Sequence, residues 1–148
     1  MTFRDRLLAT IQAARSVLEQ PGVLVVGSEV PNLLEPGAAA TLVVSQDLDI
    51  GVPIDCHAAV RRRLPDLLLH FTQSEDEPSV WTPRSAGLLE VNFVGIDRTQ
   101  DPTDAYALED DRLPLLVFGA LSLIEPGAEI DIEGTRIRVP RPAGLLLE

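Results

Sequence analysis

One stretch of sequence decides the fold: Ser45-Gln46-Asp47-Leu48-Asp49-Ile50-Gly51-Val52. Two acids alternate in it with apolar residues, which is the pattern of a β-strand with one face toward a core. Side chains on a strand alternate between faces, so Asp47 and Asp49 share one face, about 6.5 to 7 Å apart along the chain, and Leu48 and Ile50 share the other. Like charges so placed repel and tend to raise each other's pKa, unless water or a bound cation offsets them.

The spacing of this acid pair suits Mg²⁺. This cation prefers one or two protein carboxylates and takes the rest of its shell from water and substrate phosphates. The pair therefore indicates phosphoryl chemistry. The plainer interpretation is a solvated acidic face at a strand end, and the two acids taken alone favour it.

A second feature lies upstream of the acid pair. Val23-Leu24-Val25-Val26 predicts a buried strand that runs into a turn at Gly27-Ser28, and Pro31 suits the first turn of a short helix after it. Glycine lets the backbone approach a ligand closely, and free N–H groups at the start of a helix can receive phosphate oxygens. An acid-bearing strand in the same domain makes this turn stronger evidence of a phosphate site.

With these residues the chain resembles the nucleotidyltransferase superfamily with the DNA polymerase beta-like catalytic domain, in particular its small bacterial members related to abortive-infection toxins. The matching parts are Gly27-Ser28, the segment from Ser45 to Ile50, a later apolar strand with a further acid, and the segment 137–142. The resemblance implies an α+β fold, in which a mixed β-sheet has helices packed mainly on one face. It also implies a single domain over residues 1–148 that lacks a C-terminal helical region.

The resemblance further implies a Mg²⁺-dependent transfer of a nucleoside monophosphate from an NTP to a hydroxyl acceptor. The acceptor and the identity of the NTP do not follow from it. In this family the Gly-Ser turn holds the triphosphate, the D-x-D acids bind Mg²⁺, and a third acid completes the metal site and helps activate the attacking hydroxyl. The nucleotide-binding residues implied here are Gly27, Ser28 and Ser45. The implied metal ligands and catalytic residues are Asp47, Asp49 and Glu90.

Two features depart from the family pattern. The stretch between Ser28 and Asp47 is longer than usual, and the place of the third acid looks like Asn92, with Glu90 two residues earlier. Both side chains fall on one face of their strand, so Glu90 either reaches the metals from the next pleat or pairs with an arginine across the sheet. An amide carries no charge and cannot act as a general base. With Asn92 in the third position, the chain is a catalytically weak or inactive module that binds a nucleotide or a protein partner.

The composition is that of one small globular domain. The chain has 148 residues, of which 45% are hydrophobic and 24% charged, with one cysteine, Cys56. A lone cysteine excludes an internal disulfide framework, and with no secretory signal we expect a cytoplasmic protein. The net charge of -11 argues against a broad nucleic-acid-binding surface. The longest apolar run is too short for a membrane span, which needs about 20 residues.

Proline and glycine residues, which interrupt helices and strands, and the spacing of apolar residues predict the remaining elements. A helix is expected from Thr2 to Gln20, with Thr2 as its N-cap, and a second helix over 55–64 carries the arginines 61–63 on a solvated face. Apolar residues 145–147 have no partner in view, so we expect either a domain cut from a longer protein or a homo-oligomer in which a second subunit covers them. The other expected elements are a strand over 67–72, a strand over 88–96, a polar loop near the site over 97–112, a buried helix or strand over 115–124, and a hairpin of 129–132 with 135–139.

Overall fold

A computed structural model describes residues 2–26, 47–101, 104–119, 126–132 and 134–140. The predicted turn at 27–28, the short helix after it and the C-terminal segment 141–148 lie outside the described residues. The described elements are α1 (Phe3–Ala13), α2 (Arg15–Leu18), β1 (Leu24–Val26), β2 (Asp47–Pro53), a 3₁₀ turn (Ile54–Cys56), α4 (His57–Leu67), β3 (Phe71–Gln73), β4 (Val80–Pro83), β5 (Glu90–Ile96), β6 (Ala105–Leu108), β7 (Leu115–Phe118), β8 (Pro126–Ile132) and β9 (Thr135–Pro140).

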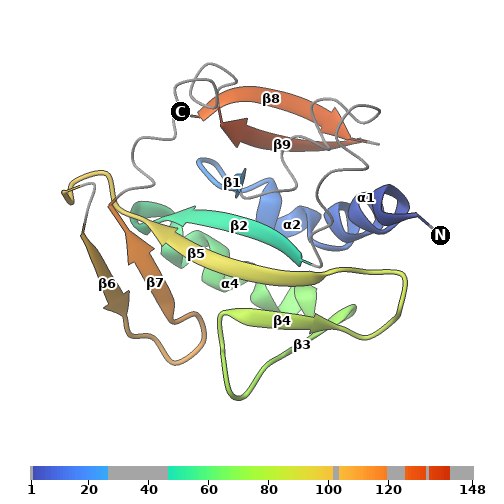
Figure 1. Cartoon of the computed structure of the whole chain (residues 1–148), viewed down its shortest axis with the longest axis horizontal. Helices are drawn as coiled ribbons and strands as arrows, with labels where there is room; N and C mark the ends of the chain where they lie inside the picture. The colour runs from blue at the N-terminus through green and yellow to red at the C-terminus, as the bar shows by residue number, and fades with distance from the viewer. Residues whose placement is uncertain (1, 27–46, 102–103, 120–125, 133, 141–148) are drawn as a thin grey trace.

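Strands β1 to β7 form one mixed sheet around β5. β1 is antiparallel to β2, and β2 is parallel to β5 along the whole of both strands. The other edge of β5 has two partners, antiparallel β4 near its start and parallel β7 at its end. β3 extends the sheet from β4, and β6 extends it from β7. We call the point where β4 and β7 diverge from β5 the fork, and Figure 1 shows it below β5.

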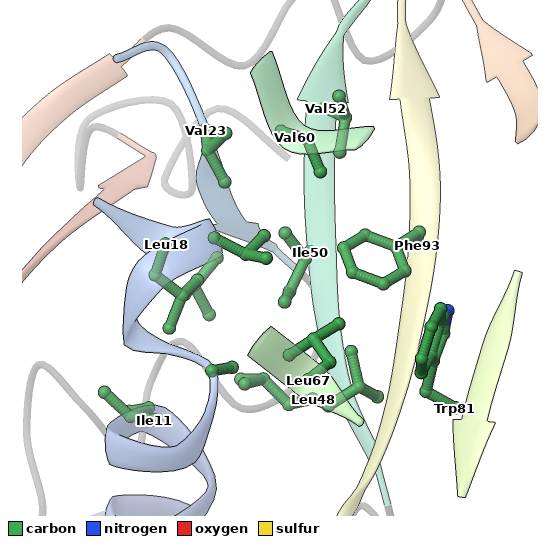
Figure 2. Close-up of a cluster of buried hydrophobic side chains, with 14 of the residues drawn as sticks. Ile11, Leu18, Val23, Leu48, Ile50, Val52, Val60, Leu67, Trp81 and Phe93 are labelled. Carbon is green, nitrogen blue, oxygen red and sulfur yellow. The ribbon is translucent and has the colours of Figure 1, made fainter. Parts of the chain in front are cut away.

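Helix α4 lies behind β2 and β5 in the view of Figure 1, and residues of α1, α2 and α4 share one core with a face of the sheet. The face they cover carries the apolar residues of β2 and β5, and Figure 2 shows Leu48, Ile50 and Phe93 of this set side by side. Burying one such side chain stabilises the fold by about 1.5–3 kcal/mol. The buried helical residues of the same core are Leu7, Ile11, Ala14, Val17, Leu18, Val60, Leu64 and Leu67. The expectation of an α+β fold with a mixed sheet is confirmed.

A hairpin of β8 and β9 forms a second, two-stranded sheet. Its β9 strand lies against β1 and α2, and Ile137 and Val139 belong to the main core. Gly134 in the turn has a φ of +89°, a conformation in which glycine avoids the steric cost of a Cβ. The hairpin predicted around this glycine is confirmed.

The N-terminal helix begins as the sequence predicts. The Thr2 hydroxyl accepts a hydrogen bond from the Asp5 N–H, and the Asp5 carboxylate accepts one from the Thr2 N–H, both at 3.1 Å. The single helix expected up to Gln20 is divided at Ala14 into α1 and α2. The break lets the second segment bury Val17 and Leu18 in the core.

Two predicted boundaries are wrong in the segment that follows β2 in sequence, namely the end of α4 and the start of β3. Helix α4 continues through Pro65 to its end, because Val60, Leu64 and Leu67 form one buried stripe at helical spacing. The strand predicted from residue 67 therefore begins only at Phe71.

The segment 97–112 is not a polar loop throughout. It contains β6, in which the half-buried Tyr106 and Leu108 alternate with exposed alanines and pair with β7. β7 joins β5 at Gly95 and Ile96, the C-terminal end of β5, and β6 extends the sheet from β7. Glu90 is at the N-terminal end of β5, so β6 lies far from it along the strand. The expectation that this segment lies near the acid pair is therefore wrong for β6.

Thr10 joins α1 to the start of β5. Its buried hydroxyl accepts a hydrogen bond from the Leu89 N–H and donates one to the Arg6 carbonyl, both at 2.7 Å. Thr10→Val keeps the volume but leaves the Leu89 N–H without this partner, so we expect a loss of about 1–3 kcal/mol in the free energy of unfolding. Urea denaturation measures it. Thr10→Ser, which keeps the hydroxyl, should lose less, and a valine variant as stable as wild type would contradict the role of this bond.

Candidate functional site: an acidic patch on the sheet face away from the helices

The candidate site lies on the face of β2 that does not pack on the helices. Asp47 and Asp49 are half-buried there, whereas Leu48 between them is fully buried in the core. The predicted alternation of this strand is therefore confirmed. The acids stand on a strand flanked on both sides by other strands, so their backbone positions are fixed by the sheet.

Strand register sets the neighbours of each acid. Glu90 is paired with Asp47, and Asn92 is paired with Asp49. Neighbouring strands lie about 4.7–4.9 Å apart, so paired residues on one face have adjacent side chains. We call these four residues the acidic patch. On the other side of β2, Val26 of β1 is paired with Asp49.

Asp49 has a strongly perturbed acidity, with a pKa raised to about 7. The largest cause is burial, which disfavours the charged form. The next is Asp47, whose carboxyl group hydrogen-bonds to that of Asp49 and repels its charge. The Asn92 amide acts in the opposite direction, since its hydrogen bond favours the charged carboxylate. Near neutral pH the Asp49 carboxyl group is therefore only partly ionised.

A cation is one ligand that these two carboxylates could hold. It would offset the repulsion between the carboxylates, and Mg²⁺ often uses only one or two protein carboxylates beside water and phosphate oxygens. In the part of the chain that the structure describes, no group of three or more His, Cys, Asp and Glu residues is placed to hold a metal ion. The donor set is therefore the two aspartates, with Glu90 on the same face beside Asp47.

The three residues expected to bind the nucleotide, Gly27, Ser28 and Ser45, lie outside the described residues. Val26, which precedes the predicted Gly-Ser turn in sequence, lies beside Asp49. The strand that leads into this turn therefore ends at the acidic patch.

Arg61, one of the arginines predicted on a solvated face of α4, forms two ion pairs at the surface. Its Nε lies 3.1 Å from the Asp110 carboxylate, and its Nη2 lies 2.7 Å from that of Asp111. These ion pairs raise the pKa of Arg61, with the Asp111 hydrogen bond as the largest cause. Arg61 thus fixes the segment before β7 against α4 and is occupied by protein carboxylates.

A further polar cluster was not foreseen from the sequence. Asp97, directly after β5, is almost fully buried and accepts hydrogen bonds from the N–H and hydroxyl of Thr99, at 2.9 and 2.6 Å, and from the Tyr106 hydroxyl at 2.8 Å. The Thr99 bonds lower the pKa of Asp97, and Asp97 raises that of Tyr106. The Asp-x-Thr spacing, typical of turns closed by a side chain, was the available signal. All three groups satisfy one another, so we assign this cluster to the folding of the loop.

No family model, no curated protein and no solved structure matches the chain. Among the described residues there is no helix with the length and apolar character to cross a membrane.

The acidity of Asp49 predicts a pH-dependent stability. Its pKa is about 7 in the folded protein against an ordinary value of 3.8. The folded state thus favours the protonated acid, and the stability that this provides is lost as pH rises from about 4 through 7. A shift of one pKa unit corresponds to about 1.4 kcal/mol. Because this carboxyl group is only half-buried, we expect the free energy of unfolding to change by about 1–2 kcal/mol over this pH range.

Asp49→Asn removes the charge, so its stability relative to wild type should increase between pH 5 and pH 8. Denaturant unfolding at both pH values without divalent cations measures the difference. Asp76→Asn, in the exposed loop between β3 and β4, is the matched control and should show no such change. A constant difference for Asp49→Asn across this range would show that its carboxyl group titrates as an ordinary surface acid.

Proposed function

We propose that the chain is a Mg²⁺-dependent nucleotidyltransferase, which binds an NTP at the acidic patch and transfers a nucleoside monophosphate to a hydroxyl acceptor, with pyrophosphate as the leaving group. One observation supports this proposal above the others: Asp47 and Asp49 are half-buried and hydrogen-bonded to each other, and burial together with the charge of Asp47 raises the pKa of Asp49 to about 7. Without a ligand such a pair costs stability, and strongly perturbed carboxyl groups of this kind are common at functional sites.

Each residue of the proposed site has a defined task. Asp47 and Asp49 hold the cation, which when bound neutralises the charge on the reacting phosphates. Glu90, adjacent to Asp47, accepts the proton of the attacking hydroxyl on a carboxylate oxygen. The segment 27–45 supplies the proposed phosphate-binding residues Gly27, Ser28 and Ser45. Because phosphoryl transfer relies on positioning and charge neutralisation, these tasks suffice for the reaction.

A second candidate function is nucleotide binding with little or no turnover. The pairing of Asn92 with Asp49, and the hydrogen bond between their side chains, favours it. Asn92 lies directly across from Asp49, and its amide cannot accept a proton as a base. Glu90 lies one pleat away, opposite Asp47. The two candidates share the Mg²⁺–NTP site and differ only in whether Glu90 serves as the base.

Binding is tested by melting curves with each of the four NTPs, with and without Mg²⁺. A ligand that binds only the folded state, at 100 times its dissociation constant, should stabilise wild type by about 2.7 kcal/mol. Asp49→Asn should lose this ligand-induced stabilisation, and Asp76→Asn should keep it. Absence of any Mg²⁺-dependent shift in wild type across all four NTPs would remove the support for both candidates.

Turnover is tested by pyrophosphate release from Glu90→Gln and Asn92→Asp. If Glu90 is the base, Glu90→Gln should keep the Mg²⁺–NTP-induced stabilisation and lose about 10²–10⁴-fold in rate. If the amide limits the site, wild type should release little pyrophosphate and Asn92→Asp should release more. A wild-type rate that neither substitution changes would mean that the reaction does not use β5.

A further inference from the structure

Strand β6 forms an open edge of the mixed sheet. Among the described residues it pairs with β7 alone, so its other side presents backbone N–H and C=O groups that no described strand uses. Figure 1 shows β6 as the last strand at the left margin of the sheet. An unpaired row of this kind is a template on which another extended segment can pair. We call this open side of the strand the β6 edge.

The β6 edge lacks most of the devices that protect sheet edges from pairing. Such edges usually carry charged side chains, a proline or a bulge. β6 has the uncharged sequence Ala-Tyr-Ala-Leu and pairs with β7 over four consecutive residues without a shift in register. The other edges of the sheet are less available. β1 lies against β9, and β3 has three residues, of which Thr72 already accepts a hydrogen bond on its carbonyl from the Thr82 hydroxyl.

One face of the β6 edge is apolar and exposed. Tyr106 packs against the main core, so the alternation of the strand places Ala105 and Ala107 on the face away from the helices. These alanines are exposed, and register pairs them with Phe118 and Leu116 of β7. Leu116 is 50% exposed. Because the outer strand carries only small side chains on this face, a larger apolar side chain on an added strand would cover Leu116.

Acids stand at both ends of β6. Asp104 directly precedes the strand and Glu109 directly follows it, and both are exposed. Neither takes part in an ion pair within the described ranges. The next acids after Glu109 are Asp110 and Asp111, which form ion pairs with Arg61.

The arginines closest to β6 in sequence contact other parts of the molecule. Arg98 lines a pocket with Pro53, Ile54 and Asp55 at the end of β2. Arg112 lines a pocket with residues of α4, β3 and β4 at the fork. Both pockets lie on the β5 side of β7, and the arginines 61–63 belong to α4, on the other face of the sheet from Ala107. The charges at the ends of the β6 edge are therefore acidic.

Charge also separates two kinds of occupant. In a symmetric antiparallel pair of two β6 strands, Asp104 of each copy would lie opposite Glu109 of the other. Like charges directly opposite each other destabilise a strand pair. A segment with a basic residue at each end of its strand instead places opposite charges at both ends. The acids thus favour a basic segment of another protein over a second copy of this chain.

We propose that the β6 edge binds an extended segment of a partner protein, with apolar residues at its centre and basic residues at both ends, which adds a strand to the sheet. Backbone groups of the segment pair with those of β6, an apolar side chain covers Leu116, and the basic side chains contact Asp104 and Glu109. In this mode of recognition main-chain pairing provides affinity and side chains provide specificity. The Tyr106 hydroxyl donates to Asp97 at 2.8 Å, which orders β6 before the partner binds.

The experiment uses the full chain and fluorescein-labelled, end-capped octapeptides. The basic peptide has a pair of Lys residues at each end of a central Val-Thr-Val-Ile, and the acidic peptide has Glu in place of Lys. The basic peptide should raise the fluorescence anisotropy, with an affinity that falls at high salt, and the acidic peptide should not.

Backbone methylation of the peptide distinguishes strand addition from general charge attraction. On a strand, alternate residues direct their N–H groups toward the same neighbouring strand. Two basic peptides are therefore compared, one methylated on the backbone nitrogens of the first and third central residues and the other on those of the second and fourth. One should bind like the unmodified peptide, and the other should bind at least about tenfold more weakly, because it lacks the donors that pair with β6.

Ala107→Lys places a charge on the edge strand and should weaken binding of the basic peptide at least about tenfold. Ala58→Lys, at an exposed alanine of α4, is the matched control with the same change in net charge, and it should bind like wild type. Melting curves establish that each variant is folded.

A second pair of variants tests the charges and leaves the strand itself intact. Asp104→Asn combined with Glu109→Gln should weaken basic-peptide binding several-fold and reduce its dependence on salt. Glu75→Gln combined with Asp76→Asn, in the exposed loop between β3 and β4, removes the same charge elsewhere and should have neither effect.

Several results would overturn the proposal. They are no binding of the basic peptide at about 1 mM, equal binding of the two methylated peptides, and equal losses from Ala107→Lys and Ala58→Lys. Basic-peptide binding that Asp49→Asn abolishes and Ala107→Lys leaves intact would place the peptide on the acidic patch instead. Concentration-dependent dimers in sedimentation that Ala107→Lys abolishes, without peptide binding, would identify a second copy of the chain as the occupant.

Discussion

The parallel pairing of β2 with β5 is the constraint on which the rest of the structure depends. The two strands are in register from Asp47 with Glu90 to Pro53 with Ile96. Burial under the helices enforces this register, because a slip of one residue would turn every apolar side chain of a strand away from the core. Because Leu48 and Ile50 must face the core, Asp47 and Asp49 lie on the opposite face of the strand.

Magnitudes show why the fold tolerates a repelling acid pair. Burial of each large apolar side chain contributes about 1.5–3 kcal/mol, and Leu48, Ile50 and Phe93 are all buried on the helical face. Keeping an ionised Asp49 half-buried and beside Asp47 costs about 1–2 kcal/mol. The core outweighs this cost several times over. Local conflict of this kind, in a sequence that is otherwise consistent with its fold, is expected where a ligand binds.

Local patterns in the sequence predicted three local features correctly. Alternation placed Asp47 and Asp49 on one face, the Thr2 and Asp5 pair marked the start of α1, and Gly134 marked the hairpin turn. The neighbour of each acid was not predictable, since alternation puts Glu90 and Asn92 on the same face and leaves their offset from β2 open. That offset depends on packing between strands that are about 40 residues apart. The partners of Arg61 escaped prediction for the same reason, because Asp110 and Asp111 approach it only in the folded chain.

The fork depends on β5 in a different way from the acidic patch. The Phe93 N–H donates to the Ser79 carbonyl next to the hairpin, and two residues later Gly95 pairs with β7. A Cβ on Gly95 would lie 2.6 Å from the Val117 side chain, so glycine is required for β7 to approach this closely. The segment that carries Arg112 leads directly into β7. The close packing of β7 on β5 therefore brings the Arg112 carbonyl beside Gln73. One strand thus sets both features: its outward residues Glu90 and Asn92 complete the acidic patch, and its change of partner from β4 to β7 creates the fork.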